Sequence, residues 1–344
     1  MSTTPKIALL FPGQGSQTVG MGRAFYDASP AARAVFDEAD SALGFPLSQI
    51  IFEGPEDTLK LTEHTQPAIL TVSVAALRVL EPELKSRNLS IAFAAGHSLG
   101  EYSAHVAAGT FSFADAVRTV RSRGQFMQSA VAPGQGAMAA ILGLDADRIN
   151  DICAAVSDEL TQPPISDPAD PIQQTHTGVS AIVAPANINS PNQIVISGST
   201  AAVELAAQRC KDAGAKRAVM LPVSGPFHSA LMQPAQDLLA TALESIFFND
   251  PAFPVAANAD ARLLTRAPEV RDALIRQVTA PVRWVECIQL LAQSGATHFI
   301  EVGPGKVLTG LNRQIDKSLS TTNVEDPASL EATLAAITAQ PTAS

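Results

Sequence analysis

Residues 96–100, GHSLG, form a GxSxG pentapeptide with Ser98 at its centre. A serine on a tight strand-to-helix turn projects its hydroxyl away from the backbone, and small residues two positions before and after it let the turn close. The apolar segment 89–95 precedes the pentapeptide, and a helical pattern closed by Gly109 follows it. Since a lone GxSxG also occurs by chance, this context is what predicts that Ser98 is a nucleophile.

A nucleophilic serine needs a general base, and His228 is the best candidate in the sequence. It lies in residues 225–229 (GPFHS), after a predicted strand and just before a predicted helix. The alternative is a capping or buried structural histidine, which a lone histidine more often is. The other histidines are His64, His97, His105, His176 and His298. His97 is adjacent to Ser98, so we expect its side chain to leave the turn in another direction and to line the site.

The third member of a catalytic triad is harder to find. An α/β-hydrolase places an aspartate or glutamate after a strand, between the serine and the histidine. Asp145 lies in that interval, but it stands at the start of a predicted helix, where capping explains it. The sequence therefore favours a Ser–His pair whose histidine is held by a backbone carbonyl.

A buried arginine near the serine would offer a fixed fork of donors to a carboxylate. Arg118, Arg121 and Arg123 all lie on a predicted helix that follows the serine segment. Their positions alone do not distinguish them, and a solvated arginine is the simpler interpretation of each.

Residues 11–17, FPGQGSQ, place two glycines behind an apolar run, as a phosphate-binding loop does. A dinucleotide-binding loop would need glycine at position 18, where Thr18 stands, and a P-loop would need GKS or GKT, which is absent. A strand-end turn that aims backbone N–H groups at developing negative charge fits better. We therefore predict part of an oxyanion hole at this loop.

The elements that must position these residues fall into two regions, each with its own order of predicted strands and helices. In the first part, apolar runs at 6–11 and 89–95 predict parallel strands, and residues 66–80 and the segment after Ser98 predict helices, which together indicate a doubly wound α/β sheet. In the second part, strands are expected at 137–144, 179–186, 193–198 and 215–223, with helices at 145–156 and 199–214. This β-α-β-β-α-β order predicts a ferredoxin-like subdomain inserted into the main sheet domain.

The remaining segments complete this scheme. After residue 225 the main sheet resumes, with strands expected at 253–258 and 297–303. Residues 157–177 carry four prolines and predict an exposed loop that includes a solvated His176. The tail beyond residue 318 is expected to fray.

Composition narrows the classes of function. The chain has 344 residues, 46% of them hydrophobic, so it can bury a sizeable core. A net charge of -10 with scattered Lys and Arg argues against nucleic-acid binding, and an acidic protein partner would need a local basic patch. The three cysteines, Cys153, Cys210 and Cys287, are far apart and indicate reduced thiols in a cytoplasmic protein rather than disulfides or a zinc site. Neither a signal peptide nor a transmembrane segment is expected.

Many motifs, in order along residues 5–315, closely resemble those of the malonyl-CoA:acyl carrier protein transacylases. They are FPGQGSQTVGMG (11–22), TQPA (65–68), GHSLGEYSA (96–104), RGQFMQ (123–128), GAMAAILGL (136–144), NINSPNQIVISG (187–198), PFHS (226–229), APVRW (280–284) and EVGPGKVLTGL (301–311). The resemblance implies an α/β fold with an α/β-hydrolase-like parallel sheet core and an inserted ferredoxin-like (βαββαβ) small subdomain. We assign residues 1–133 and 224–318 to the discontinuous large subdomain, 134–223 to the small subdomain and 319–344 to a C-terminal tail.

The resemblance also implies catalytic roles. Ser98 would be acylated by malonyl-CoA, and His228 would act first as base and then as acid. The backbone carbonyl of Gln277 would orient His228. The N–H groups of Gln14 and Leu99 would form the oxyanion hole.

Substrate binding is assigned in the same way. Arg123 would hold the malonate carboxylate in a two-pronged salt bridge. Phe227 resembles the residue found before the histidine in malonyl-selective members, and His97 and Met127 are further candidates for substrate binding. The loop at 157–177 is longer than is usual in the family, and the tail after residue 318 matches it poorly.

The function implied is ping-pong transfer of malonyl from malonyl-CoA to the phosphopantetheine thiol of acyl carrier protein, for fatty acid or polyketide synthesis. We expect no metal or prosthetic group, and a free-standing cytoplasmic monomer that binds neither nucleic acid nor membranes. One alternative is a serine hydrolase or thioesterase acting on acyl thioesters, against which Arg123 and the missing acidic triad member argue. A non-catalytic scaffold is the other, and the joint presence of Ser98, His228, Arg123 and Gln14 argues against it.

Overall fold

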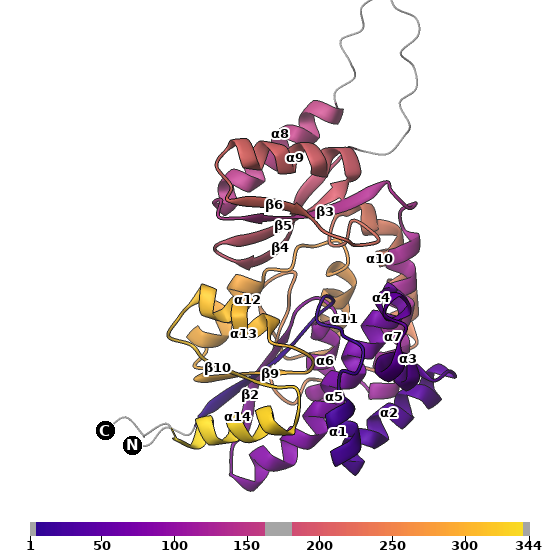
Figure 1. The fold of residues 1–344 in the computed structure, drawn as a ribbon, viewed down its shortest axis with the longest axis vertical. Coiled ribbons are helices and arrows are strands. Elements are labelled where there is room, and N and C mark those ends of the chain that lie inside the picture. The colour runs from indigo at the N-terminus through magenta and orange to yellow at the C-terminus, as the bar shows by residue number, and fades with distance from the viewer. Residues whose placement is uncertain (1–4, 162–180, 340–344) are drawn as a thin grey trace, which may run out of the picture.

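The computed structural model describes residues 5–161 and 181–339 and contains two β-sheets. Figure 1 shows the larger sheet within a layer of helices, and the smaller sheet above it with α8 and α9 on its outer side. No helix in the described ranges is both long and apolar enough to cross a membrane.

The larger sheet has six strands in the order β10-β9-β1-β2-β7-β8. The strands are β1 (Lys6–Phe11), β2 (Ser90–Gly96), β7 (Val255–Ala256), β8 (Leu263–Leu264), β9 (His298–Val302) and β10 (Ser320–Val324). All neighbours are parallel except β7 and β8, which are antiparallel. This order confirms the predicted α/β class with a mainly parallel sheet.

Strand β1 runs through the middle of this sheet and is buried on both faces. Its side chains alternate between two hydrophobic clusters, with Ile7, Leu9 and Phe11 on one face and Ala8 and Leu10 on the other. A continuous apolar run is typical of a parallel strand that helices cover on both sides.

Helices cover both faces of the larger sheet (Figure 1). On the face of Ile7 and Leu9 the cluster includes side chains from α2, α5, α6, α7, α10, α11 and α14, and on the other face it includes side chains from α12 and α13. The helices of this part are α1 (Arg23–Ala28), α2 (Pro30–Leu43), α3 (Leu47–Glu53), α4 (Glu56–Lys60), α5 (Thr62–Ser86), α6 (Gly100–Ala107), α7 (Phe113–Ser129), the 3₁₀ turn η1 (Ala230–Met232), α10 (Gln233–Glu244), α11 (Ala267–Arg276), α12 (Trp284–Gln293), α13 (Val307–Ile315) and α14 (Pro327–Ala339).

The smaller sheet is antiparallel, with the order β4-β5-β3-β6. Its elements are β3 (Gly136–Leu142), α8 (Ala146–Thr161), β4 (Val183–Ser190), β5 (Gln193–Ser199), α9 (Thr200–Asp212) and β6 (Arg217–Met220). The chain order is the predicted β-α-β-β-α-β, and a separate core of Ile, Val, Ala and Cys side chains joins this sheet to its two helices. All six elements lie inside the predicted range 134–223, whose limits stay a prediction.

Three predicted boundaries differ from the structure. The helix expected at 66–80 is the middle of α5, so Pro67 lies inside the helix rather than near its start. Strand β4 begins at Val183 and ends at Ser190, later than the expected 179–186. Helix α8 continues to Thr161, so residues 157–161 are helical. The rest of the predicted loop up to residue 177, His176 included, lies outside the described residues.

The expectation that the chain frays beyond residue 318 is wrong for residues 320–339. Strand β10 pairs in parallel with β9, and α14 buries Leu330, Leu334 and Ile337. Residues 320–324 read STTNV and lack the apolar run that predicts an inner strand. Strand β10 lies at the edge of the sheet with one neighbour, and an edge strand does not need such a run. The predicted tail is thus an ordered strand and helix, and only residues 340–344 of it lie outside the described range.

Candidate active site

Ser98 stands on a sharp turn between β2 and α6, with a φ angle of 51°. Two close approaches explain the flanking glycines. A Cβ on Gly96 would lie 1.9 Å from the backbone of Gly100, and one on Gly100 would lie 2.0 Å from the carbonyl oxygen of Phe11. No side chain fits in either place, so the two glycines let the turn close and hold Ser98 in a left-handed conformation.

His228 and Ser98 are 130 positions apart in the sequence but adjacent in the fold. The Ser98 Oγ and His228 Nε2 atoms are 2.7 Å apart. The Nδ1 atom lies 2.9 Å from the carbonyl oxygen of Gln277 and 3.1 Å from that of Ala280. Because carbonyl oxygens only accept, Nδ1 carries the proton, which leaves Nε2 free to accept the serine proton.

Burial, followed by the charge of Arg123, lowers the pKa of His228 to about 3. The imidazole is therefore neutral at physiological pH, as a general base must be. Asp145 takes no part in the pair, since its Oδ1 accepts from the N–H of Asp147 at 3.0 Å, at the start of α8. Its position agrees with the capping role that the sequence predicts.

Of the three arginines on α7, only Arg123 enters the site. Arg118 pairs with Asp115 at the surface, and Arg121 lies over the ring of Phe45. Arg123 is 1% exposed, donates through Nη1 to Gln66 Oε1 at 2.7 Å, and donates through Nη2 to Gln277 Oε1 at 3.0 Å. The same Nη2 lies 3.2 Å from Ser98 Oγ. The structure thereby places a buried guanidinium beside the nucleophile.

The glycine loop at 13–15 packs directly against the serine turn. A Cβ on Gly13 would lie 2.4 Å from the carbonyl oxygen of His97, so only glycine lets these backbones approach. Within residues 5–161 and 181–339, neither Gln14 N–H nor Leu99 N–H donates to a protein acceptor, and both residues line the same cavity. Two free backbone donors beside a serine can stabilise an oxyanion.

A cavity of about 400 Å³ opens above Ser98. Its lining combines residues from the loops after strands β1 and β2 of the larger sheet with Met138 and Asn187 of the smaller sheet. It includes the substrate-binding candidates His97, Met127 and Phe227. His97 leaves the turn in another direction, as expected, and its Nε2 lies 2.7 Å from Asn189 Oδ1 on β4. Burial lowers the pKa of His97, so this side chain is a neutral hydrogen-bonding wall of the cavity.

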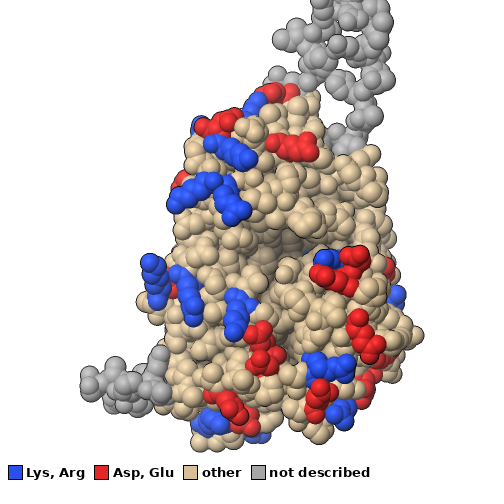
Figure 2. Space-filling model, in the orientation of Figure 1, with Lys and Arg blue, Asp and Glu red and all other residues tan. Residues whose placement is uncertain are grey.

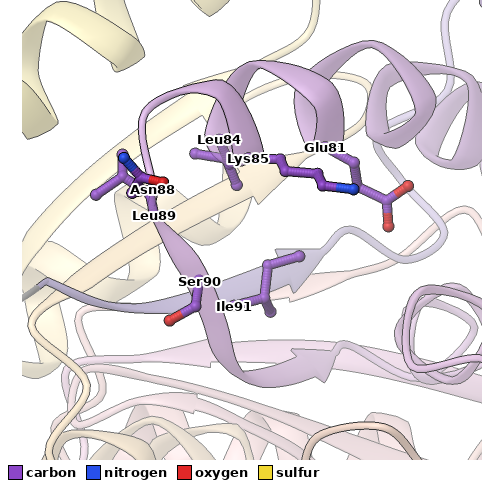
Figure 3. A pocket seen from close by; sticks show the side chains of 7 residues that line it. All are labelled: Glu81, Leu84, Lys85, Asn88, Leu89, Ser90 and Ile91. Carbon is purple, nitrogen blue, oxygen red and sulfur yellow. The ribbon is translucent and has the colours of Figure 1, made fainter.

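A second hollow, shown in Figure 3, lies at the opposite end of β2 from Ser98. It is bordered by the end of α5 and by the loop into β2, where Ser90 begins the strand. Since the carboxyl ends of parallel strands carry the site in open α/β sheets, this hollow is at the wrong edge for the chemistry.

Three polar residues of the site were missed by the sequence analysis. Gln66 accepts from Arg123; Asn258 Oδ1 accepts the Ser98 N–H at 2.7 Å, and its Nδ2 donates to Gly96 O at 2.8 Å. Glu101 is fully buried and accepts from the side chain of Gln277 at 2.7 Å. One signal was available for Gln66 and Glu101, because each lies in a motif that carries the family resemblance, TQPA (65–68) and GHSLGEYSA (96–104).

The described residues contain no group of three or more His, Cys, Asp or Glu side chains that could hold a metal ion. The cysteines Cys153, Cys210 and Cys287 are free and buried. Burial raises the pKa of each thiol, so none is poised as a nucleophile.

Comparison with known proteins gives a consistent match. The chain matches the acyl transferase domain family over residues 8–181 and 165–332. It is 47% identical over 326 residues to the malonyl CoA-acyl carrier protein transacylase of Bacillus subtilis, covering 95% of each chain. It is 45% identical over 329 residues to the protein of the same name from Escherichia coli K12, covering 96% of this chain and 99% of that one.

Solved structures match as closely. An acyl-carrier-protein-S-malonyltransferase from Bartonella henselae is 43% identical, with a TM-score of 0.87 over 97% of this chain and 99% of that chain. A malonyl-transacylase in complex with its type II PKS acyl-carrier protein is 44% identical, with a TM-score of 0.85 over 96% of this chain and 99% of that chain.

Proposed function

The chain belongs to the acyl transferase family, within which its relatives are malonyl CoA-acyl carrier protein transacylases, and we propose that it transfers malonyl from malonyl-CoA to the phosphopantetheine thiol of acyl carrier protein. The reaction supplies extender units for fatty acid or polyketide synthesis. One observation carries the proposal: Ser98 Oγ lies 2.7 Å from the Nε2 of His228 and 3.2 Å from the guanidinium of Arg123. A nucleophile, its base and a carboxylate-binding group thus meet at one atom.

In the first half-reaction, Ser98 Oγ attacks the thioester carbon of malonyl-CoA while His228 Nε2 accepts the hydroxyl proton. The N–H groups of Gln14 and Leu99 hold the oxyanion that forms. As the intermediate collapses, the carbon–sulfur bond breaks, and His228 returns the proton to the sulfur of departing CoA. The products are malonyl-Ser98 and free CoA.

Arg123 selects the acyl group. Its fork is held by two neutral amide oxygens, from Gln66 and Gln277, so its charge stays available to the malonyl carboxylate. An acetyl group would leave this buried charge unpaired. Selection is therefore electrostatic, and it acts next to the reacting atom.

In the second half-reaction, the pantetheine thiol takes the place of CoA. His228 accepts the thiol proton, and the sulfur attacks the ester carbon of malonyl-Ser98. The carbon–oxygen bond to Ser98 then breaks, His228 returns the proton to Ser98 Oγ, and malonyl-carrier is released. Release of free malonate by water is the competing outcome and would make the protein a thioesterase. The relatives are transacylases, which favours transfer over that alternative.

Two further parts of the proposal concern cofactors and location. Every step uses only side chains and backbone groups of the chain, so we propose that the reaction needs no metal or prosthetic group of its own. We also propose a cytoplasmic location, which the three free, buried cysteines support.

Intact-protein mass spectrometry tests the proposal. After brief incubation with malonyl-CoA, the native protein should gain one malonyl group, and holo acyl carrier protein should then remove it as malonyl-carrier. Ser98→Ala should gain none, because the nucleophile is gone. Adduct formation by Ser98→Ala, or release of free malonate in place of malonyl-carrier, would overturn the proposal.

A further inference from the structure

Glu101 is a buried carboxyl group in the first turn of α6, three residues after Ser98. It forms no ion pair with any of the described residues, and burial raises its pKa to about 7. Burying a carboxylate away from a counter-ion costs free energy unless hydrogen bonds compensate it. Its hydrogen bonds therefore indicate what the side chain does.

One oxygen of Glu101 accepts both of its hydrogen bonds. Oε2 accepts from the side-chain Nε2 of Gln277 at 2.7 Å and from the backbone N–H of Asn258 at 3.0 Å. The other oxygen, Oε1, has no hydrogen-bond partner among the described residues. The carboxylate is thus an acceptor shared by two residues that support the site.

Gln277 contacts both the general base and the carboxylate-binding arginine. Its backbone oxygen holds Nδ1 of His228, and its side-chain Oε1 holds Nη2 of Arg123 at 3.0 Å. Its Nε2 also donates to the backbone oxygen of Ser98 at 2.9 Å. If this amide turned over, its NH₂ group would face the guanidinium, and donor would meet donor.

Glu101 opposes that turn together with the carbonyl oxygen of Ser98. Its Oε2 already accepts from the backbone N–H of Asn258, so this oxygen is an acceptor and requires the NH₂ group of Gln277 on its own side. The same oxygen fixes the backbone of Asn258, whose side chain accepts the N–H of Ser98. A single atom of Glu101 is therefore connected to the base, to the carboxylate-binding arginine and to the serine turn.

We propose that Glu101 is a positioning residue that sets the amide orientation of Gln277 and thereby holds Arg123 in the geometry that selects malonyl. The inference rests on the proposed function. In this inference, the property of Glu101 that matters is its acceptor oxygen rather than its charge. Glutamine at position 101 keeps such an oxygen, whereas alanine and methionine do not.

The chain offers a matched control in Glu301. This carboxyl is also fully buried, and it accepts from the N–H groups of Leu308 and Thr309 at 3.0 and 2.7 Å. None of its bonds reaches Ser98, His228 or Arg123. Glu301→Ala therefore reports the effect of removing a buried acceptor on folding alone.

The experiment measures single-turnover loading of Ser98 from malonyl-CoA and from acetyl-CoA by quenched intact mass. Glu101→Ala should slow malonyl loading roughly 10- to 100-fold, since small misplacements of catalytic groups cost that much. Its malonyl-over-acetyl preference should fall roughly 10-fold, while Glu101→Gln stays within about 3-fold of native protein in both measures. Glu301→Ala should keep the native preference.

A double variant tests the route through Gln277. If Glu101 acts on Arg123 through that amide, Glu101→Ala with Gln277→Ala should show the same malonyl-over-acetyl preference as Gln277→Ala alone, whereas independent effects on the preference would multiply. Should Glu101→Ala not fold, Glu101→Met fills the space without an acceptor and replaces it. Multiplying effects, a native preference without the acceptor, or equal losses in Glu101→Gln would overturn the inference. Native protein that loads no malonyl would overturn the proposed function as well.

Discussion

Arg123 carries its charge into the protein without a carboxylate partner. Among the residues that the structure describes, it forms no ion pair within 4.0 Å, and its hydrogen-bond partners are two amide oxygens and the hydroxyl of Ser98. Its direct hydrogen-bond partners are all neutral, and the Glu101 carboxyl acts on it from beyond Gln277, so a substrate carboxylate gains more there than it would at the surface. We therefore expect acyl selection to depend chiefly on Arg123 and on the residues that hold it in place.

Arg123→Ala should reverse the acyl preference. Malonyl loading should lose roughly 2–5 kcal/mol of transition-state stabilisation, the usual cost of truncating one partner of a buried charge pair, while acetyl loading changes much less. The kcat/KM values for loading from the two CoA esters measure this. Arg118→Ala, on the same helix but paired at the surface with Asp115, is the control and should keep the preference. Equal losses for both esters would contradict an electrostatic clamp.

His228 predicts an unusual pH profile. Its protonated form cannot accept the serine proton, so loading must slow as pH falls through its pKa, which burial and Arg123 hold at about 3 rather than 6.5. The kcat/KM for malonyl loading should therefore stay flat from about pH 6.5 down to about pH 5, where an ordinary histidine would already be mostly protonated.

The position of the acid limb can be tested through Arg123. Removing its charge removes one cause of the lowered pKa, so the acid limb of acetyl loading in Arg123→Ala should move to higher pH than in native protein. Arg118→Ala should leave the limb in place. A limb already near pH 6.5 in native protein would show that burial and Arg123 do not lower the pKa of His228.

At the scale of elements, the sequence predicts structure best where a local pattern is compatible with only one element. The apolar run Lys6–Phe11 is a central strand, and residues 96–100 form the turn between a strand and a helix. Strand β10 was not predictable, because its STTNV sequence lacks the apolar pattern of an inner strand.

Part of the site was also hidden from sequence reasoning. Ser98, His228 and Arg123 come from motifs, but the links among Glu101, Gln277 and Asn258 join residues more than 150 positions apart. A glutamine or an asparagine gives no local pattern that reveals its distant partner. Only the folded chain shows which of the polar residues meet.

The serine turn makes a sharp prediction about its glycines. Gly100→Ala should abolish malonyl loading and lower the melting temperature, because its Cβ would lie 2.0 Å from the carbonyl oxygen of Phe11. Gly310→Ala in α13 is the control, since a Cβ there meets nothing within 4 Å and alanine favours a helix by about 1 kcal/mol. Thermal denaturation and intact-mass loading measure both. A folded, active Gly100→Ala protein would show that the turn does not need this close approach.

At the scale of the whole molecule, the site is shared between the two sheets. His97 and its partner Asn189 connect the serine turn to β4, and Ser190 of the same strand donates to Gln314 of α13 at 2.9 Å. Helix α13 therefore packs against β4, the strand that supplies Asn187 to the cavity lining. Figure 2 shows a hollow on this face, with Lys and Arg side chains to its left over the region of α12 and α13.

These positive charges lie on a chain whose net charge is -10. A carrier protein that is itself acidic would be repelled by the molecule as a whole, so a local basic surface would have to bring its pantetheine arm to Ser98. Arg313 and Lys317, in α13 and just after it, are exposed and form no ion pair with any described residue. We expect them to contribute to that surface.

Reversing both charges should weaken use of the carrier without impairing chemistry. In Arg313→Glu with Lys317→Glu, the KM for holo acyl carrier protein should rise roughly 3- to 10-fold, and its salt dependence should flatten, because rim charges act mainly on association. Loading from saturating malonyl-CoA should stay native, since neither residue lines the cavity. The control reverses Lys85, beside the hollow at the far end of β2 in Figure 3, together with Lys211 of α9, so the net charge changes equally. If both double variants raise the carrier KM alike, the effect is long-range and α13 is not a docking surface; if only the first does, the carrier approaches Ser98 over α13.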